Sequence, residues 1–493
     1  MLTNDKIEKI IKVMDIILAV TGFFVLVSLV FVVGFYLSSW WVAFFAYITD
    51  AAILIFIIHE IIRFLLAPSV KFHFQERWIE MIIVGLAFIQ ILFPETVKDI
   101  FEFFVPGVNP AKITLLYLGI LEISLLFILT VKLLRINDVI SRIKLHPGAI
   151  ISLSFLLVIL TGSLLLMLPR ATLPESPISY IDALFTSTSA VCVTGLNVID
   201  PATKFTTFGK LVVLMLIQVG GLGVMTLTTF FAFFLAGGLS VKARLVMKDM
   251  LSEDSLAEVK KLLYKILLYT LVIEIIGAIF LYIFTVRHNL LFDSDLFYLS
   301  VFHSVSAFCN AGFSLYSENL MYADTVNNYG YLTTIMLLIV FGGLGFVVHA
   351  NLIDYFRNKK KNKIIMLKIH TKIVLISTAF LIFVGGLIIF LFEPYAFAKN
   401  FSLFDKFFHS IFLSVTSRTA GFNTVPSELI TPATTMVVIL LMWIGASPGS
   451  TGGGIKTTTL SVVFITLYNF IIGKERVEIF KREINPDGIK LAF

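Results

Sequence analysis

The sequence predicts an all-α polytopic membrane protein, with four N-terminal spans followed by tandem units of span, short helix, polar loop and span. Three observations support this class. Of the 493 residues, 58% are hydrophobic and only 14% are charged, and the mean hydropathy is +0.96. Apolar runs of about 20 residues, long enough to cross a bilayer, recur along the chain. A polar motif ending in glycine occurs three times. We therefore expect a lipid bilayer to surround this chain.

Residues 1–144 form a predicted annex of four spans, at 13–37, 41–66, 78–93 and 112–134. The third is short and ends at Pro94. Basic residues precede the first span and follow the fourth: Lys6, Lys9, Lys12, Lys132, Arg135, Arg142 and Lys144. By the positive-inside rule, the N-terminus is expected in the cytoplasm of a cell with a plasma or inner membrane. The first apolar run is too long for a cleaved signal peptide.

The three polar motifs share an order of small residues that ends in Gly195, Gly312 and Gly421. They read Phe185-Thr-Ser-Thr-Ser-Ala-Val-Cys-Val-Thr-Gly195, Phe302-His-Ser-Val-Ser-Ala-Phe-Cys-Asn-Ala-Gly312 and Phe412-Leu-Ser-Val-Thr-Ser-Arg-Thr-Ala-Gly421. The glycines are 117 and 109 residues apart, which indicates a long internal repeat. Small hydroxyl residues and glycine suit a re-entrant loop whose carbonyl oxygens line a water-filled path and replace an ion's hydration shell.

Each motif lies between two apolar spans, which defines three units at 145–262, 263–370 and 371–493. The spans are predicted at 149–168 and 211–236, at 263–286 and 331–353, and at 371–392 and 432–472. A short helix and a loop lie between the two spans of each unit. In the second unit they are predicted at 295–313, and in the third at 403–422. Basic residues follow the second span of each unit: Lys242, Arg244, Lys248, Arg357, Lys359, Lys360, Lys361, Lys363, Lys474, Arg476, Lys481 and Arg482. The loops should therefore enter the membrane from outside.

Glycines interrupt the second span of each unit. The sequence Gly-Gly-Leu-Gly occurs at 220–223 and again at 342–345, where either close helix packing or a break would explain it. In the third unit, residues 445–454 contain Pro448 and several glycines and cannot be ordinary helix. Non-helical backbone at membrane depth is tolerated where it is buried or lines a cavity. We therefore expect an intramembrane loop there, which we call the interrupting loop.

These motifs, with Ser450-Thr-Gly-Gly-Gly-Ile-Lys-Thr-Thr458, resemble the Trk/Ktr/HKT superfamily of potassium transporters from Leu145 to about Arg482. The resemblance implies span–pore-helix–filter–span units around a central ion pore, a homodimer and a cytoplasmic nucleotide-binding regulatory ring. It places the selectivity filter in loop 1 (Val191, Cys192, Val193, Thr194, Gly195), loop 2 (Phe308, Cys309, Asn310, Ala311, Gly312) and loop 3 (Ser417, Arg418, Thr419, Ala420, Gly421). In that family, glycine in every filter goes with K⁺ and serine in the first goes with Na⁺.

The resemblance also makes the interrupting loop a gate below the filter, and its residues are Gly445, Ser447, Pro448, Gly449, Ser450, Thr451, Gly452, Gly453, Gly454 and the following Lys456. One departure stands out, since the family has four units and this chain shows three. Only about 70 residues follow Gly421, so we expect either a shortened C-terminus or a last quarter supplied from elsewhere. Residues 450–452 are only 31 residues beyond Gly421 and align with the gate, which excludes them as a fourth filter.

Charged residues near the loops have alternative roles. Asp182, Asp295 and Asp405 begin the short helices, where capping is favoured over attraction of cations at the outer mouth. Lys456 is expected near the pore axis, where its charge would raise a barrier unless a salt bridge holds it. Arg418 would repel K⁺ and is expected to tie loop 3 to a carboxylate. Glu274, inside a span, is a candidate partner for a basic group. Cys192 and Cys309 occupy matched positions, which argues against a disulfide.

Enzyme chemistry is not expected. The run 449–457 nearly spells a phosphate-binding loop but lies inside a span, and His59-Glu60-Ile-Ile-Arg63 lacks the second histidine of a zinc protease. No covalent cofactor, metal cluster or nucleic-acid partner is expected. The leading hypothesis is the K⁺-conducting subunit of an uptake system, with coupling to Na⁺ or H⁺ left open. The alternatives are a secondary transporter of another small solute and a truncated, non-conducting paralogue.

Overall fold

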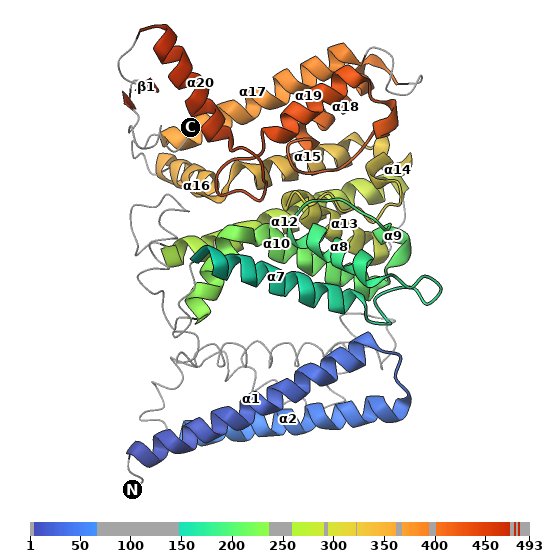
Figure 1. The fold of residues 1–493 in the computed structure, drawn as a ribbon, viewed down its shortest axis with the longest axis vertical. Coiled ribbons are helices and arrows are strands. Elements are labelled where there is room, and N and C mark those ends of the chain that lie inside the picture. The colour runs from blue at the N-terminus through green and yellow to red at the C-terminus, as the bar shows by residue number, and fades with distance from the viewer. Residues whose placement is uncertain are drawn as a thin grey trace. The chain divides into compact units, whose positions relative to one another are not determined.

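The structure is a computed structural model that describes residues 4–66, 147–235, 259–289, 294–321, 323–360, 367–393, 401–473, 478–479 and 482–483. This part of the chain is almost entirely helical, as Figure 1 shows; its only strands are β1 (Glu478–Ile479) and β2 (Arg482–Glu483), which pair antiparallel. The chain separates into two compact units, one built on the first two helices and the other on α7 to α20. The all-α polytopic class predicted from composition is confirmed.

The N-terminal unit contains a hairpin of two long helices, α1 (Asn4–Gly34) and α2 (Ser39–Leu65), each apolar enough to span a membrane. A cluster of charged side chains joins them. Arg63 Nη2 donates to both Asp15 carboxylate oxygens, at 2.7 and 2.6 Å, and His59 Nε2 lies 3.0 Å from Asp15. His59 Nδ1 lies 2.9 Å from Glu60. Charges inside a membrane need such partners, so the His-Glu-x-x-Arg run serves helix pairing here.

Two of the four predicted annex spans, at 78–93 and 112–134, lie outside the described residues. In the second compact unit, the first repeat comprises α7 (Pro147–Leu166), α8 (Tyr180–Val191), the short α9 (Pro201–Lys204) and α10 (Thr207–Leu235). The second comprises α12 (Val259–Asn289), α13 (Ser294–Phe308), η1 (Asn319–Met321), α14 (Ala323–Val326), α15 (Tyr329–Leu344) and α16 (Phe346–Lys360). The third comprises α17 (Ile369–Phe392), α18 (Leu403–Thr416), η2 (Ser427–Leu429), α19 (Pro432–Trp443) and α20 (Thr457–Ile471).

The helices that follow each loop are broken at glycines. Gly223 interrupts α10 with a φ of 52°, and α15 and α16 meet at Gly345 with a bend of 98°. The third break is the interrupting loop between α19 and α20. Other glycines in the same runs are needed for close packing, which was the alternative explanation. A Cβ on Gly220 would collide with the carbonyl of Val191, and a Cβ on Gly342 would collide with that of Phe308. Each Gly-Gly-Leu-Gly run therefore combines a packing glycine with a hinge glycine.

The short helices α8 and α18 begin with capping boxes. Ser179 Oγ accepts the backbone N–H of Asp182, whose carboxylate accepts the backbone N–H of Ser179. Ser402 and Asp405 repeat the arrangement in α18. The predicted capping role of these two aspartates is confirmed, and Asp295 lies in the first turn of α13. The caps fix where each short helix starts and thus where its C-terminal end delivers the loop.

The three repeats also share a packing contact that fixes each short helix on its first span. A glycine of the span lies against a serine of the short helix and a leucine of the second span, so that any Cβ on the glycine would overlap both. The trios are Gly162, Ser187 and Leu216; Gly277, Ser304 and Leu338; and Gly385, Ser414 and Leu441. In each repeat the serine hydroxyl also donates to a backbone carbonyl of the span.

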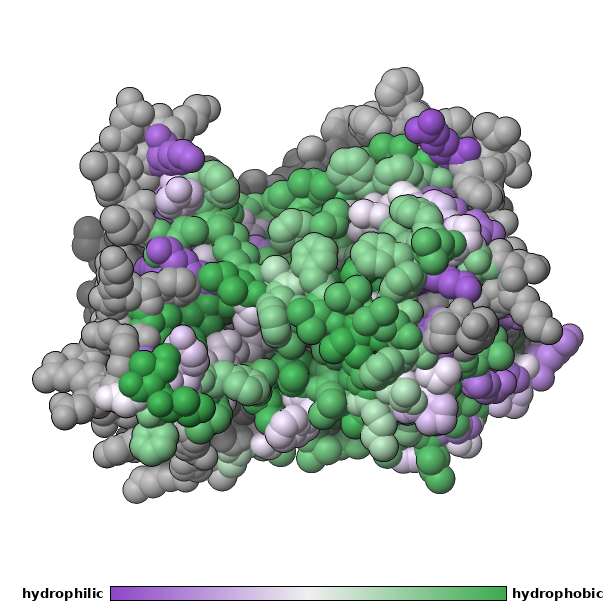
Figure 2. Space-filling view, turned by 90° about the horizontal axis from the view of Figure 1, so that it is seen from above, coloured by the Kyte–Doolittle hydropathy of each residue, from purple (hydrophilic) through white to green (hydrophobic). Residues whose placement is uncertain are grey.

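Figure 2 shows one face of the molecule, seen over the C-terminal repeat. Apolar side chains cover its middle, and hydrophilic side chains gather toward its two edges. Large apolar residues of α17 and α19 contribute exposed surface, among them Phe380, Phe383, Leu387, Met436 and Trp443. An exposed apolar belt with polar ends is what a bilayer requires of a spanning bundle.

Candidate functional site

The three loops have one backbone conformation in common. The final glycine of each has positive φ, at 80° for Gly195, 68° for Gly312 and 82° for Gly421. Two residues earlier, a non-glycine residue also has positive φ: Val193 at 56°, Asn310 at 59° and Thr419 at 101°. Such values are uncommon outside glycine and tend to occur at functional sites. The same strained pattern at the same place in three loops indicates one shared task.

The loops lie beside one another in a fixed order. A Cβ built on Gly195 would lie 2.6 Å from the carbonyl oxygen of Ala311 in loop 2, and one on Gly312 would overlap the carbonyl oxygen of Ala420 in loop 3. Loop 2 is therefore in the middle, and all five of its residues are buried. Glycine is needed twice over at these two positions, once for φ and once for space. Gly421 has room, since its nearest neighbour would be 3.7 Å away.

Short hydrogen bonds hold each loop to the end of its helix. The backbone N–H of Thr194 donates to Ser189 O and that of Ala311 donates to Ser306 O, both at 2.8 Å, while Ala420 N–H donates to Thr416 O at 2.9 Å. In loops 2 and 3 the hydroxyls of Ser306 and Thr416 donate to the carbonyl one residue after the glycine. The N–H groups are thus directed back toward the helices.

Apart from Phe308 O, the carbonyls of the three loops accept no such bonds in the described part of the chain. Among the described residues, no hydrogen bond is accepted by the carbonyl oxygens of 192–195, 309–312 or 418–421. The residues of loop 2 are buried, and buried backbone carbonyls need a partner, which water or a cation would supply. The short helices also end directly before the loops, so their partly negative C-terminal ends meet there. The arrangement offers free oxygen ligands and a favourable field for a positive ion.

The interrupting loop completes the broken helix of the second repeat. Because α15 ends just before Gly345, the carbonyls of Gly342 and Gly343 lack the N–H partners that a continuous helix would provide. They instead accept from Thr451 N, at 3.3 Å, and Ser447 N, at 3.0 Å. In return, Phe346 N donates to Gly449 O at 3.0 Å. Three backbone hydrogen bonds thus join two breaks that lie about 100 residues apart in the sequence.

The same loop also reaches the filter-like loops. Thr451 Oγ1 donates to Phe308 O at 3.2 Å and accepts from Asn310 Nδ2 at 2.9 Å, both in loop 2. On the other side, a Cβ on Gly452 would lie 2.5 Å from Thr419 Oγ1 in loop 3. Residues predicted as filter and as gate are therefore brought together at one place, through Thr451 above all.

The charged residues named from the sequence have the following contacts. Lys456 Nζ donates to Gly452 O at 2.8 Å, inside the interrupting loop, and forms no ion pair within the described residues. Arg418 is 7% exposed, its Nε has no partner, and no ion pair joins it to a carboxylate among the described residues. The expected carboxylate tie is thus not found in this part of the chain.

Glu274 is a candidate partner for a basic group, but within the described residues it pairs with none. Its carboxylate accepts from Gln218 Nε2 at 3.2 Å and lies 3.9 Å from Cys309 Sγ of loop 2. Both cysteines are free thiols, as matched positions had indicated. Within the described residues, no group of histidine, cysteine and acidic side chains could hold a metal ion.

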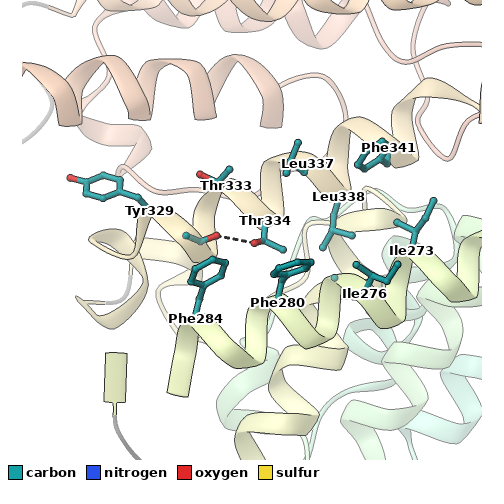
Figure 3. Close-up of a pocket in the computed structure, with 12 residues that line it drawn as sticks. Ile273, Ile276, Phe280, Phe284, Tyr329, Thr333, Thr334, Leu337, Leu338 and Phe341 are labelled. Atoms are coloured by element: carbon teal, nitrogen blue, oxygen red, sulfur yellow. Dashed lines mark hydrogen bonds between the residues drawn. The ribbon is translucent and has the colours of Figure 1, made fainter. Parts of the chain in front are cut away.

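A separate cavity of about 490 Å³ lies between α12 and α15. Figure 3 shows that its walls are apolar, with Ile273, Ile276, Phe280 and Phe284 of α12 opposite Leu337 and Phe341 of α15. Thr334, one of its few polar side chains, donates to Gly330 O at 2.8 Å and so has its hydrogen bond within the helix. The cavity is mostly apolar, whereas the three loops present free carbonyl oxygens, so the loops are the candidate site for an ion.

Comparison with known proteins identifies the family. A family model described as TrkH, a cation transport protein, matches residues 126–493. The chain belongs to this family. It is similar to the potassium/sodium uptake protein NtpJ of Enterococcus hirae, with 36% identity over 359 residues that cover 71% of this chain and 76% of NtpJ. It is also similar to the Ktr system potassium uptake protein B of Vibrio alginolyticus, with 40% identity over 338 residues covering 68% and 72%.

A solved structure supports the fold. The crystal structure of the potassium transporter TrkH from Vibrio parahaemolyticus matches with a TM-score of 0.53 and 18% identity, covering 84% of this chain and 78% of that one. The suspected superfamily is therefore confirmed, and the chain is a membrane cation transporter by family, not an enzyme. The motifs had located the loops; the Gly–Ser–Leu trios were missed, although glycine about 33–36 residues before each loop glycine was a usable signal.

Proposed function

We propose that this protein is the K⁺-conducting subunit of a bacterial K⁺ uptake system. The observation that carries the proposal is the set of free carbonyl oxygens in three adjacent loops of one conformation. Rings of backbone carbonyls can replace the hydration shell of K⁺. The names of NtpJ and of the Ktr proteins of Vibrio alginolyticus and Bacillus subtilis support K⁺ as the ion.

In this proposal the filter consists of residues 191–195, 308–312 and 417–421. Glycine at 195, 312 and 421 lets the loops approach closely and leaves the carbonyls as the only ligands. NtpJ carries sodium as well as potassium in its name, so Na⁺ conduction through the same loops is the second candidate.

The interrupting loop is the proposed gate. Its hydrogen bonds from Thr451 to loop 2 and its contact at Gly452 with loop 3 support a position directly against the filter. In this proposal the gate is closed in the structure described here. Lys456 Nζ donates to Gly452 O, and this bond would hold the positive charge of Lys456 close to the ion path. Opening would require the three backbone bonds to Gly342, Gly343 and Phe346 to break or shift together.

We also propose that this protein works in a larger assembly. A relative named protein B of a Ktr system supports a further component, for which the family resemblance suggests a cytoplasmic nucleotide-binding ring, and a homodimer of pore subunits. The basic segments that follow the spans support a cytoplasmic N-terminus and filter loops entering from outside.

The selectivity proposal is tested by Gly312→Ser. A serine Cβ would overlap Ala420 O and sit at a φ of 68°, so loop 2 should widen and lose its K⁺ preference. The measurement is Rb⁺ uptake, with Na⁺ competition, by cells lacking their own potassium importers. We expect Rb⁺ uptake in the parent and a several-fold smaller K⁺/Na⁺ ratio in the variant.

Ser410→Ala is a suitable control, because that hydroxyl bonds only within its own helix. Unchanged selectivity in Gly312→Ser would contradict the filter assignment. Competition of uptake by organic solutes in place of Na⁺ would favour a solute transporter.

A further inference from the structure

The apolar cavity between α12 and α15 is a groove in the surface of the second repeat. Gly277, Thr334 and Leu338 line it and are buried, so they form its floor. Its sides are large apolar side chains that are partly exposed: Ile276, Phe280, Leu337 and Phe341. Figure 3 shows these four side chains on the two facing helices. The groove is therefore open to whatever surrounds the helices.

Both helices of the groove belong to candidate membrane spans. Residues Lys265–Arg287 of α12 are long and apolar enough to cross a bilayer, and α15 meets the same criterion together with α16. The groove runs along α15 from Tyr329 to Phe341, which is about 18 Å at the rise of an α-helix. The hydrocarbon of one leaflet is about 15 Å deep, half of the bilayer core. The groove thus has the length of one acyl chain and opens into the acyl chains of the membrane.

The groove is polar at one end and apolar at the other. Tyr329 and Thr333 line it near Phe284, whereas Phe341 lines the opposite end (Figure 3). Arg287 is exposed and follows Phe284 by three residues on α12, which places it on the same helix face, one turn beyond the groove. In the proposed orientation this is the outer end. A cation and hydroxyl groups at headgroup depth, followed by an apolar channel, match the order of groups in a phospholipid.

The sides of the groove suit an acyl chain better than a second protein helix. Helices associate in a membrane through small residues that allow close approach and through polar side chains that bond across the interface. The sides instead present isoleucine, leucine and two phenylalanines, which keep another helix away from the floor. A slender chain of methylene groups can enter between them and gain van der Waals contact. Arg287 adds charge complementarity for a phosphate, which an arginine binds through two parallel N–H donors.

We propose that this groove binds one phospholipid of the outer leaflet, with an acyl chain between α12 and α15 and the phosphate at Arg287. The inference stands apart from the proposed ion filter. Tyr329, at the outer end, donates its hydroxyl to Asp405 Oδ1 in the first turn of α18, and its ring centroid lies 5.0 Å from that of Phe408. The bound chain therefore rests against the joint between the second and third repeats and stabilises it.

The test is native mass spectrometry of the purified full chain, stripped of lipid in detergent and then mixed with dioleoylphosphatidylglycerol. We expect one tightly held lipid per chain and a higher melting temperature when this lipid is present. Dioleoylglycerol has the same acyl chains without the phosphate and should be held several-fold more weakly. Arg287→Gln removes the phosphate contact and Ile276→Trp narrows the groove, so each should lower the retention of the phospholipid several-fold.

Each variant has a matched control. Lys265→Gln removes a cation from the opposite end of the same span. Ile279→Trp makes the same exchange on α12 at a residue that does not line the groove and is 51% exposed, against 48% for Ile276. Both controls should hold the phospholipid as the parent does.

Three results would overturn the lipid site: a parent that holds no phospholipid, equal retention of dioleoylglycerol, or retention unchanged in both Arg287→Gln and Ile276→Trp. A change of oligomeric state in Ile276→Trp with the lipid retained would also overturn it, because a second copy of the chain would then cover the groove. None of these results bears on the ion filter, which is tested separately by Rb⁺ uptake.

Discussion

The second and third repeats break the helix after their loops in opposite ways. In the second, one residue at Gly345 turns the chain by 98° and helix resumes at Phe346. In the third, helix stops at Trp443 and resumes only at Thr457. The short break leaves carbonyls of α15 without partners, and the long break provides the N–H groups that they accept. Neither break would be stable alone in a membrane, since unpaired backbone is costly there.

The comparison can be broken at the hinge. Gly345 has a φ of 87°, and a Cβ on it would lie 2.5 Å from Pro448 O. Gly345→Ala should therefore destabilise the protein by about 1–3 kcal/mol from backbone conformation alone, with the overlap adding to it. We expect a clearly lower melting temperature of the purified protein and little Rb⁺ uptake. A variant as stable and active as the parent would show that the hinge does not need the left-handed conformation.

The comparison can be sharpened two residues earlier. Gly343 is helical, and a Cβ on it would meet Ala446 Cβ at 3.7 Å, an ordinary contact. Gly343→Ala should leave stability unchanged or raise it by about 0.5–1 kcal/mol, because alanine restricts the unfolded chain. The same melting experiment measures it. Destabilisation comparable with that of Gly345→Ala would mean that space, not backbone conformation, decides which glycines are required here.

Much of the architecture could be predicted from local sequence. Apolar runs located the spans to within a few residues, as in 371–392 against α17 at Ile369–Phe392. The loops were found because their motif repeats, and glycine at 195 and 312 is explained by φ and by crowding against the next loop. The capping aspartates could be read from a Ser-x-x-Asp pattern. The span and cap signals are each local, and the loop motif emerges from comparing stretches that lie more than 100 residues apart.

Long-range pairing could not be predicted. Nothing near Gly345 indicates that its orphaned carbonyls accept from residues 447 and 451, since that contact depends on how two repeats pack. For the same reason Glu274 was expected to face a base, whereas the fold places it against Gln218 and Cys309. The His59-Glu60-x-x-Arg63 run lacks the second histidine of a zinc protease motif, and its sequence does not indicate that His59 and Arg63 bind Asp15 on another helix.

The most direct test of the account is Rb⁺ uptake by Thr451→Val. This change keeps the backbone bond to Gly342 but removes the hydroxyl that donates to Phe308 O and accepts from Asn310. If the interrupting loop holds the path closed against loop 2, uptake should rise several-fold while the preference for K⁺ over Na⁺ is kept. Unchanged or lower uptake with lost selectivity would contradict the account, because Thr451 would then support the filter rather than close it.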